Sequence, residues 1–314
     1  MHEMSKQKST LCIIYVSEAV REPMLDILSS TVQVPHKEGS TKCARNPASR
    51  SWLLHSFRDV IYNRTSFYIA GDSTDVKDSA LCLCKKAFEI IDFKSHCGTH
   101  PTLGSVDNIC FSPLGDESLE NVSLQAVDFS AKLYESVGVP VYLYGAASTY
   151  GSRSDVTTPT QLKDIRRQLG YFEATKSVDT APTVQPSFGT FMRSAERDSK
   201  GVSCIGAVPY IQNLNICFGS DSPRSSVVKV TAAVRIPNVV EALTLPREDG
   251  CLEVACNLRS PLEADSASVL VRARQACESL GLSMLRSYST GPSQQELELM
   301  LRQLTNQLTY GRTD

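Results

Sequence analysis

The order in which strand-like and helix-like segments alternate is the feature that most constrains the fold of this chain. Short apolar runs typical of strands are separated by segments whose apolar residues recur at helical spacing. In the first half we expect strands at 11–16, 53–55, 66–70, 105–111 and 139–144 and helices at 20–32, 76–91 and 122–137. This order, β-α-β-β-α-β with an added strand, is that of a ferredoxin-like domain.

A similar order returns in the second half, after a helix at 158–170 and a polar linker or loop at 176–200. We expect strands at 202–208, 213–218, 242–245, 252–257 and 283–287, helices at 225–236 and 260–280, and a last helix after a capping box at 293–296. The predicted fold class is therefore α+β. We expect two ferredoxin-like α/β sandwich subdomains in tandem, over residues 1–178 and 179–314.

Composition indicates an ordinary soluble protein. The chain has 314 residues, of which 41% are hydrophobic and 21% charged, and its net charge of −2 offers no basic field for nucleic acid. No apolar run approaches the ~20 residues of a membrane helix, so we expect no transmembrane segment and no signal peptide. Eleven scattered cysteines, an odd number, favour a reducing compartment, and we expect the protein in the cytoplasm.

The segment 95–111 carries the most chemical information. His100 stands between Thr99 and Pro101, with Gly98 and Gly104 on either side, and a strand-like run follows. Histidine is the side chain whose unperturbed pKa allows it to take or give a proton near neutral pH. Taken alone, such a residue is either a catalytic group presented by a turn or a turn residue with satisfied hydrogen bonds.

Three segments resemble a known family. Gly98-Thr-His-Pro-Thr-Leu-Gly-Ser-Val-Asp107 resembles the Gly-x-His-Pro-Arg-Met-Gly-Ala-x-Asp segment of the formiminotransferase domain, the folate-dependent half of formiminotransferase-cyclodeaminase. Asn63-Arg-Thr65 and Val139-Pro-Val-Tyr-Leu-Tyr-Gly-Ala-Ala147 match that domain in the same order and at similar spacing. The chain is identified as a member of this family, without the cyclodeaminase half.

The resemblance implies a reaction and a site. The family moves a formimino group from N-formimino-glutamate to N5 of tetrahydrofolate, which is a substrate, and the matching histidine is the general base. It implies that His100 is catalytic, with His96 a satisfied turn residue. The implied substrate- and folate-binding residues are Asn63, Arg64, Asp107, Gly145 and Asn257. We expect this site between the two subdomains, with folate and a glutamate derivative as partners, no metal and a homodimer.

Departures from the family pattern keep a second function open. The arginine after His-Pro is Thr102 here, which cannot hold a carboxylate bidentately, and a Gly-Ala-Arg of the second half reads Gly206-Ala-Val208. The alternative is a non-catalytic relative with a binding or regulatory role, linked to membrane trafficking and located peripherally on the Golgi or trans-Golgi network, where animal relatives of the family associate.

Overall fold

A computed structural model of the chain describes residues 7–33, 49–151, 158–171, 184–191, 200–247, 250–259 and 263–310. The chain divides into two compact units, Met1–Val208 with Leu297–Asp314 and Pro209–Glu296. The subdomain boundary expected at 178/179 lies outside the described residues. Among the described residues, no helix is long and apolar enough to cross a membrane.

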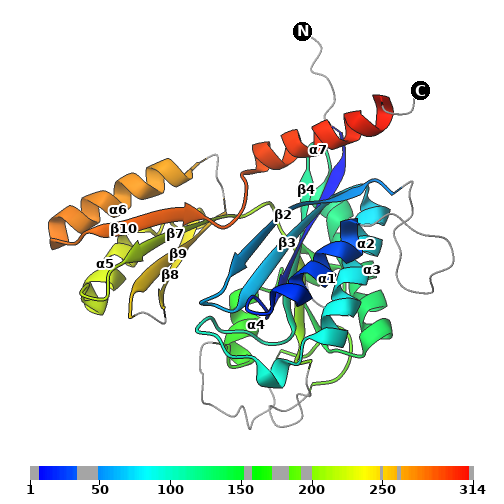
Figure 1. Ribbon diagram of the computed structural model, residues 1–314, viewed down its shortest axis with the longest axis horizontal. Coiled ribbons are helices and arrows are strands. Elements are labelled where there is room, and N and C mark those ends of the chain that lie inside the picture. The colour runs from blue at the N-terminus through cyan, green and yellow to red at the C-terminus, as the bar shows by residue number, and fades with distance from the viewer. Residues whose placement is uncertain are drawn as a thin grey trace. The chain divides into compact units, whose positions relative to one another are not determined.

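The first unit contains a six-stranded sheet in the order β2-β3-β1-β4-β6-β5 (Figure 1). Its elements are β1 (Ser9–Val16), α1 (Glu22–Gln33), β2 (Ser51–Asp59), β3 (Arg64–Gly71), α2 (Ser73–Ile90), β4 (Val106–Leu114), α3 (Leu119–Val137), β5 (Val141–Gly145), α4 (Leu162–Gln168) and β6 (Ser203–Ala207). The first four strands pair antiparallel, as a β-α-β-β-α-β ferredoxin-like core requires, and this confirms the predicted fold class.

One strand belongs to a different sheet from the one expected. The sequence pattern placed the segment 202–208 in the second half, but β6 pairs parallel with both β4 and β5. All five residues of β6 are buried, because helices lie on both faces of the sheet at this place. A short buried strand of this kind carries no pattern that reveals its partner.

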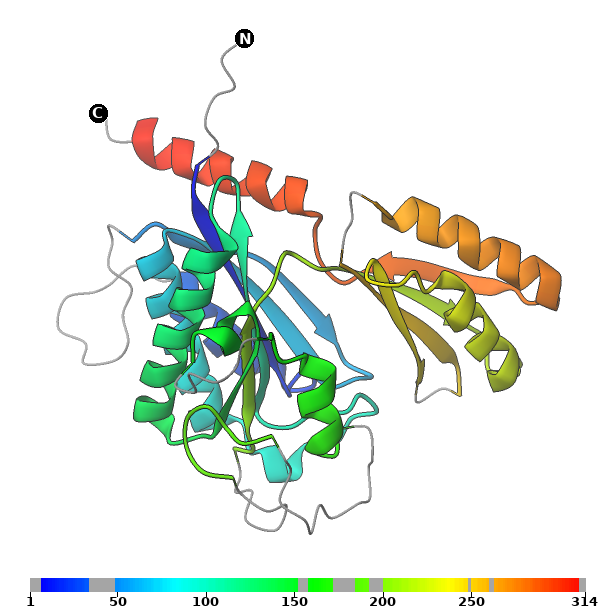
Figure 2. The ribbon, with the colours of Figure 1, turned by 180° about the vertical axis from the view of Figure 1, so that it is seen from behind.

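The two faces of this sheet have different cover (Figure 2). Alternate residues such as Val141, Leu143 and Ile205 pack in one core beneath α1, α2 and α3. The intervening residues Tyr142 and Cys204 pack on the opposite face, together with residues of α4 and Tyr171. The site described below lies on this second face.

The second unit is a complete ferredoxin-like sheet of its own. It consists of β7 (Gln212–Phe218), α5 (Arg224–Val234), β8 (Val240–Pro246), β9 (Leu252–Leu258), α6 (Ser266–Leu280) and β10 (Met284–Ser289), with strand order β10-β7-β9-β8. α6 begins later than expected, because Asp265 caps it by accepting a hydrogen bond from the Ser268 amide.

The last helix returns the chain to the first unit. α7 (Gln294–Tyr310) begins at the predicted capping box, where the Ser293 hydroxyl and amide both donate to Glu296. From Leu297 onward it belongs to the first unit, and Leu297 and Leu301 are buried.

The cysteines carry two signals about redox state. Among the described cysteines, nine are free thiols, most of them buried, which is usual in a reducing compartment, whereas Cys82 is disulfide-bonded, which is usual in an oxidising one. The compartment therefore stays a prediction.

Candidate functional site

A buried carboxylate between two guanidinium groups forms the centre of the candidate site. The Asp107 side chain is 1% exposed, and its Oδ2 lies 2.9 Å from Arg64 Nη1 and 3.3 Å from Arg166 Nη2. Its other oxygen, Oδ1, accepts a hydrogen bond of 3.0 Å from the Leu103 amide. Asp107 thus joins the ends of β3 and β4, helix α4 and the loop that carries His100.

An irregularity in β4 sets the position of Asp107. In the β1–β4 ladder Tyr15 pairs with Asn108 and Val16 pairs with Val106, so Asp107 between them has no partner in register. An extra residue of this kind is a β-bulge, which bends the strand and redirects a side chain. The Asp107 carboxylate therefore lies among the groups of the second sheet face.

His100 lies directly beside this ion cluster. Its Nδ1 is 2.7 Å from the Pro101 carbonyl oxygen and 3.2 Å from Arg64 Nη1. A carbonyl oxygen can only accept, and the contact to it is shorter than the contact to Arg64, so we assign the proton to Nδ1. The lone pair of the neutral imidazole is then on Nε2.

Electrostatics keep His100 neutral. Burial first, and then the positive charges of Arg64 and Arg166, lower the pKa of His100 from 6.5 to about 3, although Asp107 opposes the shift. Burial alone would raise the pKa of Asp107, but the two arginines outweigh it and hold that pKa below its ordinary value. At neutral pH the cluster holds two positive charges, one negative charge and a neutral imidazole.

Aromatic rings enclose the same groups. Tyr62 and Tyr171 present ring edges to the His100 imidazole, with centroid distances of 5.2 and 6.1 Å. The Arg64 guanidinium lies 4.5 Å from the ring centre of Tyr15, and that of Arg166 lies 4.3 Å from the ring centre of Tyr171. These rings limit the access of water and fix the planes of the two cations.

The glycines of the His100 loop are required by close backbone approach. A Cβ on Gly98 would lie 2.5 Å from the Tyr62 carbonyl oxygen, and one on Gly104 would lie 2.4 Å from that of Val202. Thr102, between them, directs its hydroxyl to Ser17 Oγ at 2.6 Å. The loop is therefore held at both ends, and Thr102 helps to hold it.

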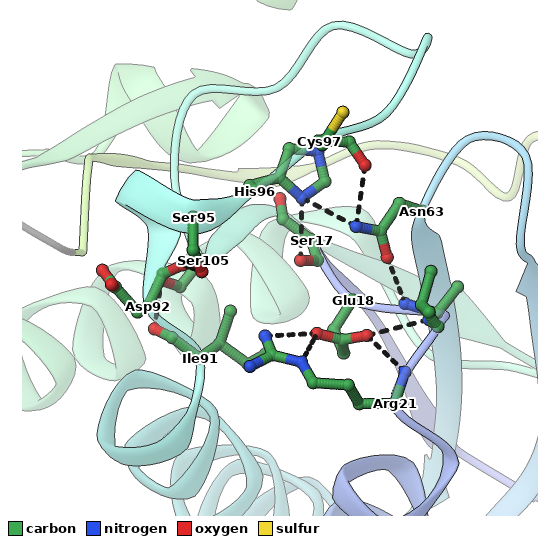
Figure 3. A network of polar contacts seen from close by, with 12 residues as sticks. Ser17, Glu18, Arg21, Asn63, Ile91, Asp92, Ser95, His96, Cys97 and Ser105 are labelled. Atoms are coloured by element: carbon green, nitrogen blue, oxygen red, sulfur yellow. Dashed lines mark hydrogen bonds and ion pairs between the residues drawn. The ribbon is translucent and has the colours of Figure 1, made fainter.

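A second polar network supports the loop from its other side (Figure 3). Asn63, in a left-handed conformation with φ of 47°, accepts from the Ala19 amide at 2.7 Å and donates to the Cys97 carbonyl at 2.9 Å. His96 Nδ1 lies 3.0 Å from the Ser17 carbonyl oxygen. The buried Glu18 carboxylate accepts from the amides of Val20 and Arg21.

Comparison with known proteins places this geometry in a family. The N-terminal subdomain of the formiminotransferase domain matches residues 9–208. The chain belongs to the formiminotransferase family. A formiminotransferase cyclodeaminase-like protein of Arabidopsis thaliana is 28% identical over 304 residues, which cover 91% of this chain and 94% of that protein.

Other relatives match over shorter stretches. A glutamate formimidoyltransferase of Thermoplasma acidophilum is 30% identical over 58% of this chain and 57% of its own length. A formimidoyltransferase-cyclodeaminase of Dictyostelium discoideum is 26% identical over 72% of this chain and 38% of its own length. The chain thus spans about half or less of the length of these two relatives.

The structure brings together three of the six residues that the resemblance implied. Arg64 contacts both His100 and Asp107 directly. Asn63 is adjacent to Arg64, but its side chain holds loops in the second network.

Of the other two implied residues, Gly145 lies in the first unit outside this cluster, and Asn257 belongs to the second unit. Gly145 ends β5 and shares a register position with Phe111, since both pair with Ala207, and Phe111 is four residues after Asp107 in β4. Asn257 is exposed on β9, and its side-chain oxygen accepts a hydrogen bond from Asn213. The expected site between the two subdomains stays a prediction.

The sequence did not predict that Arg166, Tyr62 and Tyr171 would lie at the site. Arg166 is followed by Arg167 in a short helix, and such a pair is typical of a solvated face. Only its position beside Ile165, in the buried stripe of α4, sets it apart. Within the described ranges, no three His, Cys, Asp or Glu side chains lie where they would hold a metal ion.

Proposed function

We propose that this chain transfers a formimino group from N-formimino-glutamate to N5 of tetrahydrofolate, with His100 as general base. The observation that carries the proposal is a neutral imidazole whose Nδ1 donates to the Pro101 carbonyl, which leaves the Nε2 lone pair free to accept a proton. Membership of the formiminotransferase family and similarity to a glutamate formimidoyltransferase support the substrates.

The chemistry requires one proton acceptor and a place for charge. N5 attacks the formimino carbon and forms a tetrahedral centre, the N5 proton moves to His100 Nε2, and the bond from that carbon to the glutamate nitrogen breaks as the nitrogen is protonated. A placed general base typically contributes ~10²–10⁴-fold to such a step. Asp107 holds the His100 loop through the Leu103 amide and holds the Arg64 guanidinium beside the imidazole.

The test is formation of 5-formiminotetrahydrofolate by the purified protein. We expect saturable turnover with both substrates. Absence of product at micromolar enzyme with both natural substrates refutes the transferase proposal.

A second candidate is a relative that binds reduced folate without transfer. Two observations favour it. Thr102 hydrogen-bonds to Ser17 and does not replace the arginine that the family has at this position. A His100 with a pKa of about 3 is also a weak base in the free protein. Titration with tetrahydrofolate separates the candidates, because saturable binding without turnover supports the second. Its regulatory role, the Golgi location and the homodimer stay predictions.

A further inference from the structure

The cluster around Asp107 has more positive than negative charge. One carboxylate faces both Arg64 and Arg166, so one guanidinium charge is not neutralised by a described residue of the cluster. Among the described residues, the charged groups that act on His100 are these three, and His100 also contacts the Pro101 carbonyl and the rings of Tyr62 and Tyr171. A partly buried site with excess positive charge attracts an anionic group.

Arg166 is the less committed of the two arginines. Its contact with Asp107 is 3.3 Å, against 2.9 Å for Arg64, and its side chain retains 18% exposure. Its Nε atom is buried and has no hydrogen-bond partner among the described residues. A guanidinium with a free Nε edge is suited to bind a second carboxylate through two parallel hydrogen bonds.

A second buried atom next to Asp107 is also unsatisfied. Asn108 is 6% exposed, and its Oδ1 has no partner in the part of the chain that the structure describes. Buried polar atoms in native proteins are nearly always paired with protein, water or ligand. The donor on α4 and the acceptor on β4 are therefore both available to a polar partner on this sheet face.

We propose that Arg166 is a specificity-determining residue that anchors a substrate carboxylate beside His100. The inference rests on the proposed function for the identity of the substrates, and two of them carry the required group: the glutamyl donor and the glutamate tail of the reduced folate. Thr102 cannot supply this anchor, because a hydroxyl makes no bidentate contact and Thr102 already contacts Ser17.

Binding of an anion at Arg166 also changes His100. The positive charge of Arg166 lowers the His100 pKa in the free protein, so a carboxylate that neutralises this charge raises that pKa toward neutrality. The substrate thereby makes His100 a stronger base at the time when the proton must be removed. The Arg166→Met variant lacks this positive charge, so its His100 pKa is higher in the free protein. As the solution is acidified, His100 is then protonated at a higher pH than in the wild type, and we expect activity to be lost at that higher pH.

Steady-state kinetics of Arg166→Met, Arg166→Lys and the control Arg167→Met test the anchor. Arg167 is the adjacent residue, 70% exposed and paired with Asp164 on the surface, so its removal changes the same net charge without touching the site. We expect Arg166→Met to raise one KM by roughly 10- to 100-fold, Arg166→Lys to raise it less, and Arg167→Met to leave it unchanged.

The substrate whose KM changes identifies the source of the carboxylate. A change in the donor KM assigns it to N-formimino-glutamate. A change in the tetrahydrofolate KM that disappears with tetrahydropteroate, which lacks the glutamate tail, assigns it to folate. If neither KM changes by more than twofold and the acid limb of the pH profile is unmoved, the proposal is overturned.

Calorimetric titration distinguishes failure of the anchor from failure of the proposed function. N-formimino-glutamate and tetrahydrofolate are titrated separately into the wild type and the three variants. Weaker binding of either ligand to Arg166→Met, with a smaller effect in Arg166→Lys and none in Arg167→Met, supports the anchor even if the wild type has no turnover. Equal binding to all four proteins, or no binding of either ligand to a folded wild type, overturns it.

Discussion

Replacement of Asp107 by asparagine removes the one negative charge that holds Arg64 and Arg166 together. The change is isosteric and preserves an oxygen that accepts from the Leu103 amide, so the loss is mainly electrostatic. Removing one partner of a fully buried ion pair costs about 3–5 kcal/mol. The Arg64 and Arg166 side chains are 13% and 18% exposed, so water solvates them in part, and we expect about 2–4 kcal/mol here.

The measurement is the free energy of unfolding in urea, together with the Tm. The matched control is Asp164→Asn, which removes a carboxylate from an exposed pair with Arg167 at 3.0 Å. Such surface pairs contribute about 0–1 kcal/mol, so we expect a small change in the control. For a unit of this size, 2–4 kcal/mol corresponds to a Tm decrease of about 4–16 °C.

The pH dependence of this difference has a definite sign. The pKa of Asp107 is lowered in the folded protein, so its stabilising effect is fully present above the ordinary value of 3.8 and is lost as the pH falls through the lower folded-state pKa. The stability gap between wild type and Asp107→Asn is therefore constant near neutral pH and closes in acid. A gap no larger than that of Asp164→Asn, or one that widens in acid, refutes this reasoning.

Two further substitutions test the scaffold of the site by chemical unfolding. Asn63→Ala leaves the Ala19 amide unpaired and keeps a non-glycine residue at a φ of 47°, so we expect it to lower the free energy of unfolding by about 2–3 kcal/mol. Asn63→Gly removes the same side chain without the backbone strain, so we expect its loss to be about 1 kcal/mol smaller. Equal losses in the two variants would contradict the argument from backbone strain. Gly145→Ala puts a Cβ 2.4 Å from the Ala207 carbonyl oxygen, whereas a Cβ on Gly138 has no described atom within 4 Å. We therefore expect Gly145→Ala to lower the Tm more than Gly138→Ala. A larger decrease in Tm for Gly138→Ala would contradict the packing described at β5.

Much of the fold was predictable because periodicity and caps are local properties. The capping box at Ser293 and the β-α-β-β-α-β order of the first half required only neighbouring residues. The partners of β6 were not predictable, because a five-residue buried strand pairs equally well with either sheet until tertiary packing decides. The polar segment before it favoured the wrong sheet.

The candidate site was predictable only where a motif marked it. His100, Arg64 and Asp107 stand in the segments that resemble the family, and in the structure Arg64 contacts the other two. The bulge that redirects Asp107 depends on the register between β1 and β4, which no local pattern specifies. Arg166 reaches the same carboxylate from a helix 59 residues later, and only its place next to the buried Ile165 distinguishes it from the exposed Arg167.

The most direct test of the central claim is the transfer rate of His100→Asn. Asparagine can donate to the Pro101 carbonyl as Nδ1 does, but it has no counterpart of Nε2, so the loop remains held while the base is removed. His96→Asn is the control, because His96 contacts the Ser17 carbonyl outside the ion cluster. We predict that His100→Asn retains the wild-type Tm and loses ~10²–10⁴-fold in kcat, whereas His96→Asn retains most of it. A His100→Asn variant as active as the wild type would contradict the account.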